Sequence, residues 1–198
     1  EFLLNEAEKS SAVLIGCGLS VCKDTKSIVY SVIENCTKPI VLDADALNCI
    51  CDNKNILKSA KSQIIITPHP GEMARLINST PKAVNESREE IAKAFSEKYG
   101  VVTVLKGAGT IIAAPGGKAV LNVTGNSGMA TGGSGDVLAG MTASLLAQNA
   151  TAFDAASAAV YLHGLAGDIA AEEFGKISML PSDIIECIHL AYIKCGIN

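Results

Sequence analysis

Four short, uninterrupted apolar runs constrain the fold of this chain more than any other feature. They span residues 12–16, 39–43, 64–67 and 101–105. Continuous apolar runs of this length are typical of parallel strands that helices cover on both faces. Two helical stretches lie between these runs. One ends near Cys36, and the other spans residues 84–99 with regular apolar spacing. This alternation predicts an α/β fold, a doubly wound, mostly parallel sheet with helices on both faces.

The second half of the chain adds a hairpin and a helical end. Residues 110–114 and 119–123 flank Pro115-Gly116-Gly117-Lys118, a sequence that predicts a β-turn between two strands. Helices are expected over residues 137–147, 152–173 and 181–195, the last with proline in its first turn. We find no linker, internal repeat or low-complexity segment in the 198 residues, and we expect one domain over residues 1–198.

Composition argues against several classes of function. The formal net charge is −4 without a basic stripe, so we expect no nucleic-acid partner. No apolar run reaches the roughly 18 residues of a membrane span, and residues 1–6 lack the pattern of a signal peptide. The seven cysteines show no metal-binding spacing, and we interpret them as reduced thiols of a cytoplasmic protein.

Polar or glycine-rich segments directly follow the predicted strands. Ligands of open α/β sheets bind beyond the carboxyl ends of the strands. We therefore expect these segments to meet at one edge of the sheet and to form a single binding site there. The segments are Gly16-Cys17-Gly18, Asp43-Ala44-Asp45, Pro68-His69-Pro70-Gly71-Glu72 and Lys106-Gly107.

A glycine-rich segment over residues 124–136 runs directly into an apolar helix. Six glycines lie between Thr124 and Gly140. Bare backbone N–H groups at the start of a helix suit a phosphate group. Asp136 lies at this helix start, where a carboxylate could remove the proton from an attacking hydroxyl. The pattern favours phosphoryl transfer, and a helix simply capped by Asp136 is the alternative.

Three further groups are candidates for ligand contact. His69 could hydrogen-bond a ligand, and Glu72 and Asp45 could hold magnesium. The alternatives are a proline-shaped turn with Glu72 in the next helix, and Asp45 as a helix cap. The run from Lys106 to Thr110 suits a nucleotide phosphate, with a tight turn and a solvated lysine as its alternative.

Taken in order, these motifs resemble the NAD(P)H-hydrate dehydratase family of the ribokinase-like superfamily over nearly the whole chain. Kinases of this superfamily usually show Asn-x-x-Glu where this chain has His69-Pro70-Gly71-Glu72, and the histidine favours the dehydratases. The other motifs are Val41-Leu42-Asp43-Ala44-Asp45-Ala46-Leu47-Asn48, Lys106-Gly107-Ala108-Gly109-Thr110 and Asn126-Ser127-Gly128-Met129-Ala130-Thr131-Gly132-Gly133-Ser134-Gly135-Asp136.

The resemblance implies an enzyme that repairs hydrated NADH or NADPH at the expense of ADP or ATP, with Mg²⁺ on the nucleotide. Asp136 would take the proton of the hydrate hydroxyl, the phosphoryl group would transfer, and phosphate would then be eliminated. The amides of Gly133, Ser134 and Gly135 would stabilise the moving phosphoryl group. The hydrate would contact Gly18, His69 and Asp136. The nucleotide would contact Lys106, Gly107, Ala108, Gly109, Thr110 and Gly135.

Family members carry a further strand–helix block before residue 12, so the resemblance also implies an N-terminally incomplete domain. An uncovered sheet edge favours association. We therefore expect a homo-oligomer, or a partner chain that supplies the block. Two other functions stay open, namely a small-alcohol or vitamin-precursor kinase and a non-catalytic nucleotide-binding fragment.

Overall fold

The computed structural model describes residues 2–197, in which a single six-stranded sheet forms the centre. Four strands run parallel and the last two pair antiparallel as a hairpin. The predicted strands and hairpin are confirmed, each shortened by one or two residues. In spatial order the strands are β1 (Val13–Ile15), β2 (Ile40–Leu42), β3 (Ile64–Ile66), β4 (Val102–Leu105), β5 (Ile111–Ala113) and β6 (Ala119–Leu121).

Helices occupy most of the remaining chain. The first half contains α1 (Phe2–Lys9), α2 (Lys23–Asn35), α3 (Asp45–Cys49), the 3-10 helix η1 (Lys54–Ser59), α4 (Pro70–Ile77), α5 (Pro81–Glu86) and α6 (Arg88–Tyr99). The second half contains the 3-10 helix η2 (Ser127–Met129), α7 (Ser134–Ala147), α8 (Ala152–Phe174) and α9 (Pro181–Lys194). The three helices expected in the second half are confirmed, with α7 starting earlier than expected.

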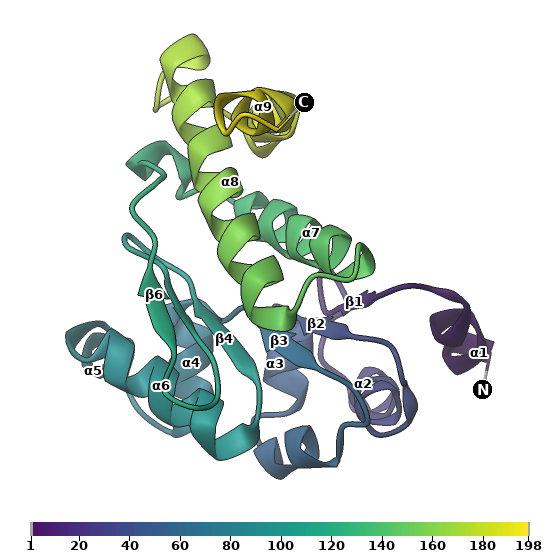
Figure 1. Ribbon diagram of the computed structural model, residues 1–198. Helices are drawn as coiled ribbons and strands as arrows, with labels where there is room; N and C mark the ends of the chain where they lie inside the picture. Colours follow the sequence, from purple (N-terminus) through teal and green to yellow (C-terminus); the bar gives the residue numbers. More distant parts are fainter. Residues whose placement is uncertain (1, 198) are drawn as a thin grey trace.

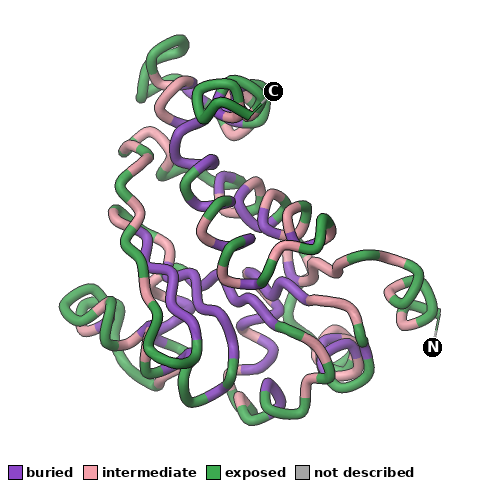
Figure 2. Tube along the Cα trace, viewed as in Figure 1, coloured by how far each residue is buried: buried purple, intermediate pink, exposed green. Residues whose placement is uncertain are grey.

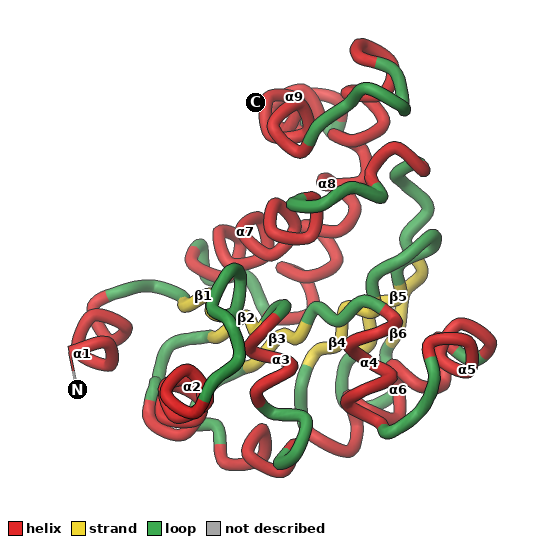
Figure 3. The backbone as a smooth tube through the Cα atoms, turned by 180° about the vertical axis from the view of Figure 1, so that it is seen from behind, coloured by secondary structure: helices red, strands yellow, loops and turns green. Residues whose placement is uncertain are grey.

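The helices form a layer on each face of the sheet, as the sequence predicts. The parallel strands lie in sequence order, and right-handed crossovers then place α2 to α6 on one face. Helices α7 and α8 cover the other face, and α9 packs against α8 beyond the sheet (Figure 1, and from behind in Figure 3). The second layer therefore comes from consecutive helices of the C-terminal half rather than from alternating crossovers.

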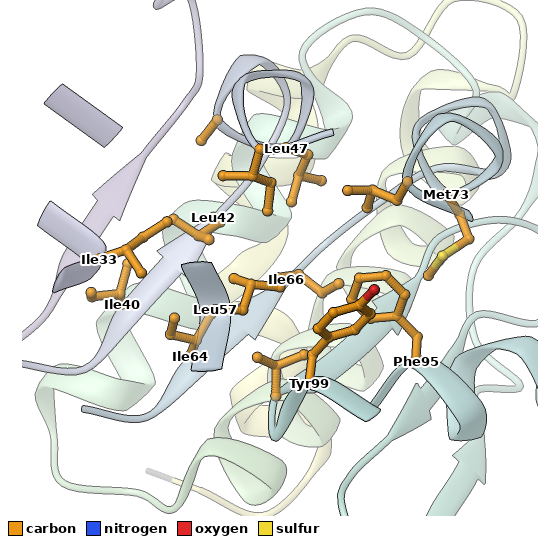
Figure 4. Packing of buried hydrophobic residues seen from close by; sticks show 14 of the residues in the cluster. Ile33, Ile40, Leu42, Leu47, Leu57, Ile64, Ile66, Met73, Phe95 and Tyr99 are labelled. Atoms are coloured by element: carbon orange, nitrogen blue, oxygen red, sulfur yellow. The ribbon is translucent and has the colours of Figure 1, made fainter. Parts of the chain in front are cut away.

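Alternate residues of the strands supply two apolar cores, one on each face. Leu42 and Ile66 pack with the α2–α6 layer in Figure 4, whereas Val41 and Ile65 pack with α7 and α8. The parallel strands β2 and β3 are buried on both faces, as Figure 2 shows, which explains their uninterrupted apolar runs. The catalytic candidates lie where these two cores meet at the carboxyl edge of the sheet.

The helix predicted by the spacing of residues 84–99 is broken in two. Helix α5 ends at Glu86 and α6 begins at Arg88, because Ser87 between them has φ −139° and ψ 48°. Val84 and Phe95 are both in the core, so the spacing identified the buried face correctly. The break could not be read from the sequence, since no glycine or proline marks it.

Two expectations from composition can be compared with the described residues. All seven cysteines are free thiols, and the expectation that most of them are buried is wrong, because only Cys36, Cys49 and Cys187 are buried. Over residues 2–197, no helix combines the length and the apolar character that crossing a membrane requires.

Candidate active site

The carboxyl ends of β2, β3 and β4 bring predicted site segments together. Backbone hydrogen bonds continue between neighbouring strands beyond their ends. The N–H of Thr67 donates to the carbonyl of Leu42 at 3.1 Å, and the N–H of Lys106 donates to that of Pro68 at 2.9 Å. The side chains of Asp43, Thr67 and Lys106 therefore stand side by side, as the sequence predicts for segments that follow parallel strands.

A buried ion pair lies at the centre of this edge. Lys106 Nζ is 2.7 Å from Asp43 Oδ1, and the Thr67 hydroxyl donates to the same oxygen at 2.7 Å. The side chain of Asp43 is only 1% exposed and that of Lys106 is 18% exposed. A carboxylate at this depth needs such partners to remain charged. The interpretation of Lys106 as a solvated lysine is therefore wrong.

Lys106 also links the sheet to the glycine-rich segment. A methyl group on Gly135 would lie 3.3 Å from Lys106 Nζ, so the ammonium group is beside the first turn of α7. The same nitrogen is 4.0 Å from Glu72 Oε2. One cation thus stands between two carboxylates and the positive end of a helix, in a corner suited to an incoming phosphate.

The loop from Lys106 to Thr110 is a tight turn held by α6. The Thr110 hydroxyl donates to the Gly107 carbonyl at 3.0 Å and closes the turn. Arg88 Nη2 donates to the carbonyls of Leu105 (2.8 Å) and Gly109 (3.2 Å), on either side of the loop. This contact could not be predicted from the sequence, because it depends on the break before α6.

Helix α7 presents free N–H groups to the same corner. Its N-cap is Gly133, which has φ 96°, a conformation that favours glycine. The N–H of Val137 donates to the Gly133 carbonyl at 3.1 Å, so the N–H groups of Gly135 and Asp136 precede the first intrahelical bond. Asp136 is an exposed first-turn residue, and its interpretation as the cap is wrong. Unlike the N–H groups of Gly135 and Asp136, the N–H of Ser134 is engaged, because it donates to the carbonyl of Thr131 at 3.3 Å.

Asp136 lies close to two residues that follow strands. Cys17 Sγ and carboxylate oxygens of Asp43 and Asp136 all lie within 4.8 Å of one another. Burial and the two neighbouring carboxylates raise the pKa of Cys17 to about 12, so the thiol is neutral and donates to Asp43 Oδ2 at 3.7 Å. A neutral thiol is a poor ligand for Mg²⁺, which prefers oxygen. The cluster is better suited to proton transfer than to holding that cation.

His69 is the N-cap of α4 and forms a reciprocal capping box with Glu72. Its Nδ1 accepts the N–H groups of Gly71 (2.9 Å) and Glu72 (3.3 Å), while Glu72 Oε2 accepts the N–H of His69 at 2.8 Å. Because Nδ1 is an acceptor, the neutral ring carries its proton on Nε2. The ring is 49% exposed, and its Nε2 lies 3.4 Å from Glu72 Oε1, so a ligand would meet this donor beside that carboxylate. Placement of Glu72 in the first helical turn is confirmed.

The carboxylate of Asp45 holds the turn after β1 and does not form an evident cation site. Its Oδ2 accepts the N–H of Ser20 at 2.7 Å. Asp45 is the first residue of the short helix α3 and Ala44 is the N-cap, so the interpretation of Asp45 as a helix cap is wrong. This tie holds the turn that contains Gly18, where φ is 66° and nothing lies within 4 Å of the place a side chain would take. Glu72 and Asp45 are both engaged, and they do not share a ligand cluster within residues 2–197. Their role in magnesium binding stays a prediction.

Protein comparisons establish the family. The family model described as NAD(P)H-hydrate dehydratase matches residues 1–190. The chain belongs to the NAD(P)H-hydrate dehydratase family. The resemblance found in the sequence is thereby confirmed, and the ribokinase-like fold is supported by the solved structures that the chain resembles.

Relatives of known name cover most of this chain. The bifunctional NAD(P)H-hydrate repair enzyme Nnr of Moorella thermoacetica is 41% identical over 184 residues, which are 93% of this chain and 35% of that protein. The ADP-dependent (S)-NAD(P)H-hydrate dehydratase of Neisseria meningitidis serogroup B is 39% identical over 87% of this chain and 59% of its own. The chain therefore spans about a third of the length of Nnr relatives and over half of the latter enzyme.

A solved structure in the family supports the same assignment. The ADP/ATP-dependent NAD(P)H-hydrate dehydratase of Bacillus subtilis, co-crystallised with ATP/Mg²⁺, superposes with a TM-score of 0.84 at 30% identity. The similarity covers 96% of this chain and 69% of that chain. The fold of this NAD(P)H-hydrate dehydratase family member is thus shared well beyond the sheet.

A buried histidine lies beneath the start of α7. His163 of α8 is only 7% exposed, and its Nε2 is 3.5 Å from Ser134 Oγ. Burial, helped by the charge of Lys106, lowers the pKa of His163 to about 4 against an opposing contribution from Ser134. From the sequence alone, His163 is expected to be a packed or solvated residue of the helix over residues 152–173, and the structure shows it packed. Its place under the glycine-rich segment was not anticipated.

The lowered pKa of His163 predicts acid sensitivity. Below its ordinary pKa of 6.5 the unfolded chain binds a proton that the folded chain refuses until about pH 4. The free energy of unfolding should therefore fall by about 3 kcal/mol as the pH drops through this window. His163→Gln should flatten that part of the profile in urea denaturation, and His189→Gln, at an exposed position of α9, is the control. Parallel profiles for wild type and His163→Gln would contradict the assignment.

Two hollows of the molecule lie away from the candidate site. A hollow of about 320 Å³ lies between α4 and α6 and includes Leu76, Ile91 and Phe95. Another of about 260 Å³ lies near Gln63 and Phe153, at the amino end of the strands. Neither includes Asp43, Lys106 or Asp136, and the candidate site is located by its charged groups and by the start of α7.

Proposed function

We propose that this chain dehydrates hydrated NADH or NADPH by phosphorylating the hydrate hydroxyl and eliminating phosphate, with ADP or ATP as phosphoryl donor. One observation carries this proposal, the placing of Lys106, the start of α7 and Asp136 in one corner. Support comes from the family match and from the relatives in Neisseria meningitidis and Bacillus subtilis, whose names specify an ADP- or ADP/ATP-dependent NAD(P)H-hydrate dehydratase.

The mechanism follows from the groups in this corner. The terminal phosphates of the nucleotide lie against the N–H groups of Gly135 and Asp136, with Lys106 neutralising their charge. Asp136 removes the proton of the hydrate hydroxyl while the hydroxyl oxygen of the hydrate attacks the terminal phosphorus. The bond from this phosphorus to the bridging oxygen breaks, and the nucleotide leaves with one phosphate fewer. The lone pair of the ring nitrogen then expels phosphate, and loss of a proton from the adjacent carbon restores the reduced nicotinamide.

The resemblance implies further contacts with the hydrate and with the nucleotide. His69 offers its Nε2–H to the hydrate, beside the open turn at Gly18. The nucleotide lies along the closed loop Lys106–Thr110. The N–H groups of Gly133 and Gly135 stabilise the moving phosphoryl group. Ser134 shapes the turn instead of donating, because its own N–H is bonded to Thr131.

Mg²⁺ belongs in this proposal only as a companion of the nucleotide. When bound, it supplies positive charge to the phosphate oxygens. The residues do not form a preformed cage for it, since Glu72 and Asp45 are engaged in capping and tethering and Asp43 is paired with Lys106. We therefore propose that the phosphates hold most of its coordination sphere. A homo-oligomer, or a partner chain completing the domain, also remains a prediction.

A direct assay tests the proposed function. The purified protein, incubated with hydrated NADH or NADPH, Mg²⁺ and either nucleotide, should restore the absorbance of the reduced cofactor. Recovery should require the nucleotide and should release phosphate in equal amount. A stable phosphorylated alcohol from a vitamin precursor, without cofactor repair, would instead support the kinase alternative. Nucleotide binding without either reaction would support the non-catalytic alternative.

A further inference from the structure

Helix α8 contacts the glycine-rich segment at both of its ends. His163 lies under Ser134 at the later end, while Asp168, one and a half turns further along the helix, contacts the earlier end. Figure 1 shows the chain between β6 and α7 passing beside this part of α8. Between the two contacts, residues 130–133 are exposed. The shape of these four residues is therefore set largely by their anchors.

Asp168 uses both carboxylate oxygens on the segment. Oδ2 accepts the N–H of Gly125 at 2.9 Å, and Oδ1 accepts Asn126 Nδ2 at 3.0 Å. The same Asn126 nitrogen donates to the Gly167 carbonyl at 2.9 Å, and Asn126 Oδ1 accepts the N–H of Gly128 at 2.9 Å. Every hydrogen-bonding atom of the Asn126 side chain is thus engaged, and hydrogen bonds to a charged carboxylate are stronger than neutral ones.

Two glycines within α8 permit this close approach. A side chain at Gly164 would overlap the Thr124 hydroxyl, and one at Gly167 would overlap the Met129 side chain. Glycine is unfavourable inside a helix, so two of them facing one loop indicate a requirement for contact. The Thr124 hydroxyl also donates to the carbonyl of Tyr161 at 2.9 Å. The face of α8 is therefore shaped to hold residues 124–129.

We propose that Asp168 is a positioning residue that holds the glycine-rich segment in the conformation that grips the phosphates of a nucleoside di- or triphosphate. It acts through Gly125 and Asn126 and does not itself touch the nucleotide. The identity of the ligand rests on the proposed function above. Amides aimed at a transferring phosphoryl group must be placed closely, because a misplacement of about 1 Å costs roughly 100-fold in rate.

Three variants test this role. Asp168→Asn keeps the shape but turns one acceptor oxygen into a donor, and Asp168→Ala removes both acceptors. Glu172→Gln is the matched control, since Glu172 is exposed on the same helix one turn later and loses the same charge. The readouts are hydrogen–deuterium exchange of residues 122–133, ADP and ATP affinity by calorimetry with Mg²⁺, and kcat and KM for the hydrate.

We expect faster hydrogen exchange in the glycine-rich segment, together with a lower kcat and a nearly unchanged KM for the hydrate. Both Asp168 variants should exchange faster at residues 125–128 while the sheet stays protected. Nucleotide affinity should fall about 10-fold and kcat by roughly 10-fold for Asp168→Asn and 100-fold for Asp168→Ala. The KM for the hydrate should change by less than about 3-fold, because the altered amides act mainly on the transferring group. Glu172→Gln should match the wild type.

Several outcomes would overturn the proposal. If Asp168→Asn matches the wild type in hydrogen exchange, nucleotide affinity and kcat, Asp168 has no positioning role. Faster exchange throughout the protein would instead show that Asp168 only stabilises the fold. If the wild-type protein binds nucleotide but leaves the hydrate unchanged, this result contradicts the proposed dehydration but not the role of Asp168. In that case exchange and nucleotide affinity still decide the role of Asp168.

Discussion

Asp136→Asn is expected to lower kcat for hydrate dehydration by about 1,000-fold, because the amide cannot take the proton of the hydrate hydroxyl. The substitution preserves shape, and Asp136 is exposed in the first turn of α7, so stability should change little. The affinity for nucleotide should stay within about 3-fold of the wild type, because the backbone N–H groups remain. Single-turnover kinetics with saturating nucleotide measures the chemical step directly.

A matched control separates this loss from a general effect of charge. Asp154 also lies in the first turn of a helix, but at the amino end of the strands, where the N–H of neighbouring Ala152 donates to Gln63. Asp154→Asn should therefore retain wild-type kcat. Near-normal turnover in Asp136→Asn would show that another group removes the proton, and the mechanism proposed above would have to be abandoned.

Lys106→Met is expected to have the largest effect on stability, because it leaves the buried carboxylate of Asp43 without its cation. Removing one partner of a buried pair costs about 3–5 kcal/mol. Since Lys106 also stands beside Gly135, the variant should lose most of its nucleotide affinity. Urea denaturation gives the free energy of unfolding, and calorimetry gives the affinity.

A second substitution distinguishes the two roles of Lys106. Asp43→Asn in the Lys106→Met background should recover most of the lost stability, because a neutral amide can be buried beside the hydroxyl of Thr67. Nucleotide affinity should stay low in the double variant, since the cation is still missing. Additive losses of stability would contradict the ion pair, and recovered affinity would contradict the contact between Lys106 and phosphate.

The sequence located the edge of the sheet that carries the site, because residues that follow parallel strands must meet there. It placed Asp43 and Lys106 at that edge, and it placed Asp136 at the start of the helix that follows the glycine-rich segment. It did not pair Lys106 with Asp43, which is 63 residues earlier, because the distance between two strand ends depends on the order of the strands in the sheet. That order follows from the crossovers and not from any local pattern.

Other features depend on geometry that no residue type specifies. The start of α7 at Ser134 follows from the positive φ of Gly133, so an aspartate that resembles a cap became a first-turn residue. The alanine-rich pattern of α8 predicted a packed helix but not which of its residues face the loop. Two glycines within that helix, Gly164 and Gly167, were the available signal for a close backbone approach, and they point to the neighbouring Asp168.

The site joins two hydrophobic cores, with consequences for how its reactivity can be tuned. Lys106 and Asp43 extend from the sheet, whereas Asp136 belongs to α7, which rests on the sheet through Leu138 and Ala139. The distance between the carboxylate of Asp136 and the ammonium group of Lys106 therefore depends on the thickness of the apolar layer between α7 and the sheet. A methyl group gained or lost in that layer would shift α7 relative to the strands and so change the distance between Asp136 and Lys106.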